Sequence, residues 1–94
     1  MLIPRPETEL LVEIALELVP ATVLDVGTGS GAVALAVADE LPGTEVTATD
    51  TSADALRLAQ SNAAKLGLER VIFTTGTLPA RGSFELELAN LPYV

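Results

Sequence analysis

The stretch TVLDVGTGSG, residues 22–31, decides the fold of this chain. Its first half is short, β-branched and mostly apolar, which predicts a buried parallel strand over residues 22–26. That strand runs directly into a glycine-rich turn. The Ala-rich apolar run that follows predicts a helix over residues 32–41, pressed closely on the sheet and ended by Pro42-Gly43. A strand, a glycine loop and a helix in this order are typical of nucleotide-cofactor sites.

Each glycine of the loop has an expected role. Gly27 permits the tight turn, Gly29 lets the backbone approach a ligand, and Gly31 lets the helix begin hard against the strand. The free N–H groups at the helix start attract anionic or polar ligand groups. The spacing Gly27-x-Gly29-x-x-Ala32 also fits the dinucleotide-binding fingerprint. The loop alone therefore leaves the cofactor open, and a purely structural turn is the alternative.

The remaining elements alternate between strand and helix. Pro6 suits the first turn of a helix that Pro20 ends, and a second long helical pattern spans residues 53–66. Further strands are predicted over residues 45–49, 71–74 and 84–89. Such alternation predicts an α/β fold with a parallel sheet wound by right-handed crossovers.

Two of the predicted helices carry a face that we expect to be buried. Thr51 or Ser52 is the expected N-cap of the helix over residues 53–66, and Gly67 lies at its end. The apolar stripe comprises Leu10, Leu11, Ile14, Ala15 and Leu18 in the first helix, and Leu56, Ala59, Ala63 and Leu66 in the helix over residues 53–66.

The composition excludes several classes of function. The chain of 94 residues carries a net charge of −8, and its five basic residues are scattered, so direct nucleic-acid binding is not expected. It contains no Cys and no His, which excludes disulfides, Cys/His zinc sites and histidine acid–base chemistry. No apolar run is long enough for a membrane span, so we expect no membrane association and a cytoplasmic location.

Two carboxylates stand beside the loop. Asp50 follows the predicted strand over residues 45–49, where it can accept hydrogen bonds from both ribose hydroxyls of an adenosine-containing cofactor. Capping of the next helix is the alternative role. Asp25 lies inside an apolar strand, where a carboxylate must be hydrogen-bonded. It either holds the glycine loop or reaches the amino-acid end of the cofactor.

The tetrapeptide Asn90-Leu91-Pro92-Tyr93 comes directly after the last predicted strand. The Asn90 amide can accept a hydrogen bond from a conjugated NH2 group, and the Leu91 carbonyl can take its second hydrogen. This would aim the nitrogen lone pair at a methyl donor, so that catalysis comes from positioning and local electrostatics. Tyr93 would form a planar wall beside the substrate, and an ordinary turn is the alternative.

Four pieces of the sequence together resemble the HemK/PrmC family of protein-glutamine N5-methyltransferases, which act on peptide-chain release factors. They are LIPRPETE (residues 2–9), LDVGTGSG (residues 24–31), Asp50, and the sequence NLPY (residues 90–93). The resemblance implies a Rossmann-like class I methyltransferase fold, here as a truncated sheet of four strands in the order 3-2-1-4. It implies one partial catalytic domain over residues 1–94, with the N-terminal motif and helix in residues 1–19 and the core in residues 20–94.

The resemblance also implies ligands. The cofactor is S-adenosyl-L-methionine, and the substrate is the glutamine of a Gly-Gly-Gln loop in a release factor. Residues 4–9 would flank the cofactor pocket. The catalytic residues that it implies are Asn90, Leu91, Pro92 and Tyr93. The cofactor-binding residues that it implies are Asp25, Gly27, Thr28, Gly29, Ser30, Gly31, Asp50, Thr77, Leu78 and Asn90.

Three positions depart from the family pattern. Leu91 replaces the first proline of the usual Asn-Pro-Pro-Tyr, which also makes the motif similar to rRNA adenine dimethyltransferases. Thr77 stands where the family often has an acid near the adenine amino group. Glu87 lies in a strand that is normally apolar, and burying it unpaired would be costly.

The resemblance covers only the front of the family's catalytic domain. We therefore interpret the chain as a fragment with weak or absent catalysis of its own, and we expect the fourth strand to be an exposed edge open to self-association. The alternatives are N6-adenine methylation of RNA or DNA, a nicotinamide-dependent or other nucleotide-binding module, and an interaction-only remnant.

Overall fold

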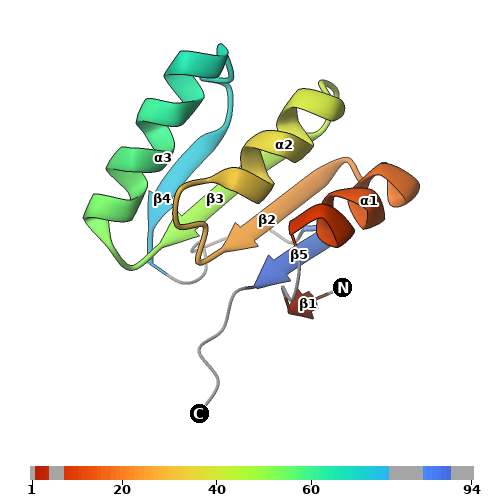
Figure 1. Cartoon of the computed structure of the whole chain (residues 1–94). Helices are drawn as coiled ribbons and strands as arrows, with labels where there is room; N and C mark the ends of the chain where they lie inside the picture. The colour runs from red at the N-terminus through yellow and green to blue at the C-terminus, as the bar shows by residue number, and fades with distance from the viewer. Residues whose placement is uncertain (1, 5–7, 77–83, 90–94) are drawn as a thin grey trace.

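The structure, a computed structural model, describes residues 2–4, 8–76 and 84–89 as one layered α/β unit (Figure 1). The strands form a single five-stranded sheet in the order β1-β5-β2-β3-β4, and every neighbouring pair is parallel. The elements are β1 (Leu2–Pro4), α1 (Thr8–Leu18), β2 (Thr22–Val26), α2 (Ala32–Glu40), β3 (Glu45–Asp50), α3 (Ala53–Leu66), β4 (Ile72–Thr75) and β5 (Leu86–Ala89).

The predicted sheet is confirmed, with one addition. The four expected strands are β2, β3, β4 and β5, and they lie in the expected order 3-2-1-4. The addition is β1, which pairs with β5 from Leu2 against Glu87 to Pro4 against Ala89. The prediction that β5 is an exposed edge is therefore wrong, because β1 takes up its outer side. This removes the structural basis for self-association through that strand.

The helices α1, α2 and α3 lie on the same face of the sheet, as Figure 1 shows. The order of the strands explains the position of α2 and α3. The strands β2, β3 and β4 are neighbours in the sheet in the same order as in the sequence, and right-handed crossovers between them place both connecting helices on one face. The main core lies between the layers, and its strand members alternate along the chain, as in Val46 and Ala48 or Leu86 and Leu88.

The helix α2 is the centre of that core. It is apolar nearly all round and rich in alanine, and its buried side chains include Val33, Ala34 and Val37. Such a surface suits a helix that has α1 on one side, α3 on the other and the sheet beneath it, as in Figure 1. The prediction that this helix packs closely on the sheet is confirmed.

The predicted buried faces of the outer two helices are only partly correct. In α1, Leu11 and Ala15 are fully buried, whereas Leu10 and Leu18 are exposed. In α3, Leu56, Ala59 and Ala63 are buried, but the side chain of Leu66 remains 64% exposed. Both helices have a neighbouring helix on one side only, so the stripe that is covered is narrower than the apolar stripe in the sequence.

Local signals placed α3 correctly at both ends. Ser52 is its N-cap, and its hydroxyl accepts a hydrogen bond from the Ala55 N–H at 3.2 Å. Gly67 ends the helix in the left-handed conformation and donates its N–H to α3 carbonyls. The edges of α2, β3, β4 and β5 differ from the prediction by one or two residues, which is the usual uncertainty at the ends of helices and strands.

Val19 adopts a positive φ of 43° immediately after α1, where its N–H donates to the Ala15 carbonyl at 2.8 Å. This conformation suits glycine and is unfavourable for a β-branched residue. Replacing Val19, which is largely exposed, by Gly is expected to raise the free energy of unfolding by about 1 kcal/mol. Urea unfolding of the chain measures this change.

The control is Leu16→Gly, which removes a similar side chain from inside α1. Glycine there is expected to lower the free energy of unfolding by about 1 kcal/mol or more, because it weakens a regular helix. Equal effects of the two substitutions would contradict strain at Val19.

Candidate functional site

One row of paired residues crosses the whole sheet near its carboxyl edge. It consists of Pro4, Ala89, Val26, Thr49 and Thr74, each at the register position of its neighbour. The strands are parallel, so the chain segments that follow this row all emerge at the same edge. Ligands of open α/β sheets bind at this edge, where the strand order reverses.

The reversal occurs at β2. From β2 the chain continues through α2 to β3 on one side, whereas β5 lies on the other side. Gly27 is the residue after Val26 in the sequence, and Asn90 is the residue after Ala89. The glycine loop and the Asn90 motif thus follow adjacent strands at the reversal point. This is where the sequence predicted the site.

The end of β3 holds the glycine loop. The N–H groups of Gly27 and Thr28 both donate to the Thr49 carbonyl, at 2.9 and 2.8 Å. The next loop amide, Gly29 N–H, donates to Asp50 Oδ2 at 2.9 Å. Two adjacent residues of β3 therefore bind three successive N–H groups of the loop, and this fixes its position over the sheet edge.

Asp50 joins the loop to α3 as well. Its second carboxylate oxygen, Oδ1, accepts the Ser52 N–H at 2.9 Å, directly before the helix. The N-cap itself is Ser52, so Asp50 supports the helix start without being the capping residue. An ionised carboxylate has about four acceptor positions. Asp50 is only half-buried, and the contacts with Gly29 and Ser52 leave acceptor capacity for further donors.

Asp25 is fully buried, and its Oδ2 accepts the hydroxyl of Thr28 at 2.8 Å. Thr28 is itself almost completely buried. This hydrogen bond links β2 to the middle of the loop that follows it. The contact corresponds to the first of the two roles predicted for Asp25, in which it holds the loop.

Gly31 and Gly29 meet different surroundings. Both have positive φ, 85° and 58°, a conformation that favours glycine. A Cβ at Gly31 would lie 3.1 Å from the Ala59 Cβ and 3.3 Å from Leu35 Cδ1, so the loop packs directly on α3 and α2. A Cβ at Gly29 would meet nothing within 4 Å, so this part of the loop faces open space that a ligand can approach.

Asn62 of α3 makes a further contact that sequence reasoning missed. Its side-chain Nδ2 donates to the Ser30 carbonyl at 3.0 Å. The signal in the sequence was a polar residue at helical spacing between the inward-facing Ala59 and Ala63. The contact unites residues 32 positions apart, so only the tertiary structure shows what the amide binds.

Several predicted site residues lie outside the described residues. They are Thr77, Leu78, Asn90, Leu91, Pro92 and Tyr93. The unusual Glu87 does lie within them, in β5, and it is half-buried rather than enclosed. The cost foreseen for a fully buried, unpaired Glu87 therefore does not arise.

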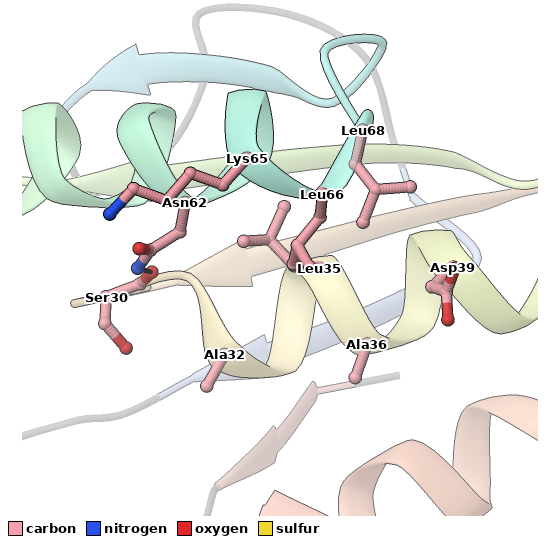
Figure 2. A pocket seen from close by; sticks show the side chains of 9 residues that line it. All are labelled: Ser30, Ala32, Leu35, Ala36, Asp39, Asn62, Lys65, Leu66 and Leu68. Atoms are coloured by element: carbon pink, nitrogen blue, oxygen red, sulfur yellow. Dashed lines mark hydrogen bonds between the residues drawn. The ribbon is translucent and has the colours of Figure 1, made fainter.

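A groove of about 440 Å³ lies between α2 and α3 (Figure 2). It runs along the two helices, and only its Ser30 end touches the glycine loop, so it is distinct from the carboxyl edge of the sheet. Its lining residues are Ser30, Ala32, Leu35, Ala36, Asp39, Asn62, Lys65, Leu66 and Leu68.

Residues 2–4, 8–76 and 84–89 lack two other kinds of feature, a membrane-spanning helix and a cluster of metal ligands. No helix there is long and apolar enough to cross a membrane. No group of three or more His, Cys, Asp or Glu side chains is placed to hold a metal ion in that part of the chain.

Comparison with known proteins gives one family match and many relatives. Residues 6–93 match the family described as "methyltransferase small domain". The chain is 50% identical to the release factor glutamine methyltransferase of Bordetella pertussis, with 100% of this chain and 37% of that protein aligned. It is also 50% identical to the protein of the same name from Deinococcus radiodurans, covering 99% of this chain and 35% of that one. The chain thus spans little more than a third of these relatives.

Among solved structures, the chain is similar to TrmN from Thermus thermophilus. The TM-score is 0.79 at 34% sequence identity, over 90% of this chain and 27% of that one. The predicted class I methyltransferase fold is confirmed, and so is the resemblance to release factor glutamine methyltransferases that the motifs indicated.

The Gly31 contact yields a prediction on stability. Gly31→Ala is expected to lower the free energy of unfolding by about 2–4 kcal/mol, because it combines an unfavourable φ with a clash against Ala59. Gly43→Ala serves as the control, since a Cβ there meets nothing within 4 Å and its φ is ordinary. Its effect should stay within about 0.5 kcal/mol. Urea unfolding of both variants measures the difference, and equal effects would contradict close packing at Gly31.

Proposed function

Because the chain belongs to the methyltransferase small domain family, we propose that it forms the cofactor-binding part of an S-adenosylmethionine-dependent methyltransferase. One observation carries this proposal. The carboxylate of Asp50 stands at the end of β3 with Gly29 bound to it, beside a glycine loop at the reversal point of the sheet. A carboxylate in this place suits the ribose of an adenosine-containing cofactor.

The residues present fit such a cofactor. The open space at Gly29 admits a ligand close to the backbone, and Asp50 retains acceptor positions for ribose hydroxyls. Thr28, Ser30 and Gly31 complete the loop around it, and Asp25 acts by holding Thr28 in place. From the family pattern we add Thr77 and Leu78 as neighbours of the adenine.

The bound cofactor would supply an electrophilic methyl group. Asn90 would accept a hydrogen bond from the substrate amide NH2, and the Leu91 carbonyl would accept a second one. These two bonds orient the nitrogen toward the methyl group and stabilise the charge that develops there. Pro92 would stiffen the turn, and Tyr93 would offer a flat apolar wall. We assign these roles from the motif NLPY (residues 90–93).

The proposed substrate is the glutamine side chain of a Gly-Gly-Gln loop in a peptide-chain release factor. The names of the relatives support it, and so does the net charge of −8, which opposes a direct contact with nucleic-acid phosphates. A release factor works with the ribosome, so we place the reaction in the cytoplasm. We treat residues 1–94 as one partial catalytic domain, in which β1 of the N-terminal segment pairs with the core strand β5.

Cofactor binding can be tested on the chain itself by calorimetric titration with S-adenosylhomocysteine. The unaltered chain is expected to bind it and to bind NAD far more weakly. Asp50→Asn should weaken binding about tenfold or more, since the charged acceptor at the end of β3 is lost. Asp39→Asn, an exposed carboxylate on α2, should change the affinity by less than about twofold. Binding of NAD alone would overturn the methyltransferase assignment.

The reaction is tested with the product of the complete gene, labelled S-adenosylmethionine and a release factor. Label is expected on the loop glutamine, and a factor with glutamate at that position should accept none. Asn90→Ala should lower kcat/KM about 100-fold through lost positioning of the amide. Label on RNA or DNA instead of protein would favour the adenine methyltransferase alternative.

A further inference from the structure

We infer that Asn62 of α3 is a positioning residue that holds the glycine loop in its ligand-binding shape. The inference rests on the proposed function for the ligand, but the contact itself is independent of it. Figure 2 shows the Asn62 side chain reaching from α3 to Ser30, where Nδ2 donates to the backbone carbonyl at 3.0 Å.

The Asn62 contact acts on a peptide group that lies between two glycines of the loop. Ser30 lies between Gly29 and Gly31, and both of these glycines adopt positive φ. Glycine has no Cβ to restrict rotation, so the peptide groups beside Ser30 can turn at little steric cost. Hydrogen bonds to these peptide groups therefore help to fix their orientation.

Asn62 supplies that hydrogen bond on one side of the peptide. The Ser30 carbonyl accepts the Asn62 amide, and the N–H of the same peptide, which belongs to Gly31, donates to the Thr28 carbonyl at 2.9 Å. Both polar groups of the Ser30–Gly31 peptide are thereby engaged. Rotation of the peptide would break both bonds.

The surroundings of Gly31 strengthen the effect. Gly31 is buried, and its packing against Ala59 places the loop directly on α3, one helical turn before Asn62. Ala59 thus sets the distance between loop and helix, and Asn62 sets the orientation of the peptide. Both come from α3, although Asp50 and Thr49 of β3 hold the other end of the loop.

Asn62 does not have to touch the cofactor in order to affect its binding. The loop N–H groups and the open side of Gly29 are useful only in one backbone conformation. Without the Asn62 hydrogen bond, the loop would also adopt other backbone conformations. The affinity for the ligand would then fall in proportion to the population of the binding-competent conformation. The bond therefore acts as preorganisation.

The test compares Asn62→Ala and Asn62→Asp with Gln60→Ala. Aspartate has nearly the size of asparagine, but its carboxylate cannot donate to the Ser30 carbonyl. Gln60 is an exposed amide on the same helix, so its removal is the matched control. Three quantities are measured: the amide NMR signals of Gly29 and Gly31 without ligand, the affinity for S-adenosylhomocysteine, and the free energy of unfolding.

Both Asn62 variants are expected to shift or broaden the two glycine signals and to weaken binding about 3- to 10-fold. Gln60→Ala should leave the signals and the affinity unchanged. Unfolding of Asn62→Ala in urea should resemble that of the control, so that lost affinity cannot be ascribed to lost stability.

Unchanged glycine signals in Asn62→Ala together with unchanged affinity would overturn the inference. A loss of affinity without any change in the glycine signals would also overturn it, since the loop would then not be the intermediary. Failure of the unaltered chain to bind S-adenosylhomocysteine would count against the proposed function instead, and the ligand-free glycine signals would then decide alone whether Asn62 holds the loop.

Discussion

Three successive backbone N–H groups of the glycine loop are held by the end of β3, through the Thr49 carbonyl and the Asp50 carboxylate. The rest of the site depends on this contact. It requires that β2 and β3 end level with each other, which the register of Val26 against Thr49 provides. A shift of this register would part the loop from both acceptors. The sheet therefore determines where the loop lies before any ligand is bound.

The helices also support the loop, because the side chains between them are small and allow close packing. The core contains very few aromatic side chains, and α2 is built largely of alanine and valine. Such residues let helices lie close to one another and to the strands. Gly31 against Ala59 is the closest example, since even one added carbon would meet the facing Cβ at 3.1 Å. Through this approach α3 comes within reach of the loop, and Asn62 can bind Ser30.

The sequence predicted those features that depend on short-range patterns. The strand over residues 22–26 and the helix over residues 53–66 were placed with correct bounds, because a glycine loop, a serine cap and a terminal glycine mark their ends. The strand β1 was missed because three residues that include a proline have no strand pattern of their own. Its strand character comes from pairing with β5, far away in the sequence.

Exposure and side-chain contacts were harder to predict for the same reason. Leu18 and Leu66 lie on apolar stripes, yet both remain exposed, and Leu66 lines the open groove between α2 and α3. A stripe shows which face of a helix turns inward but not how far its neighbours reach. Asn62 is the opposite case. It is a polar residue of α3 whose partner, Ser30, belongs to the glycine loop between β2 and α2. Asp50 supports both the loop and the start of α3 with one carboxylate, and its contact with the loop was not predicted from the sequence.

The pairing of β1 with β5 makes neighbours of two strands that are far apart in the sequence. Pro4 and Ala89 are register partners, and both strands run in the same direction. In the sequence, PRPETE (residues 4–9) begins at Pro4 and NLPY (residues 90–93) directly follows Ala89, and these two strand residues are neighbours in the sheet. Glycine loop and Asp50 follow from the next two strands along the same row. Parallel pairing in register thus brings residues that are distant in the sequence to one edge of the sheet, which is where open α/β sheets bind their ligands.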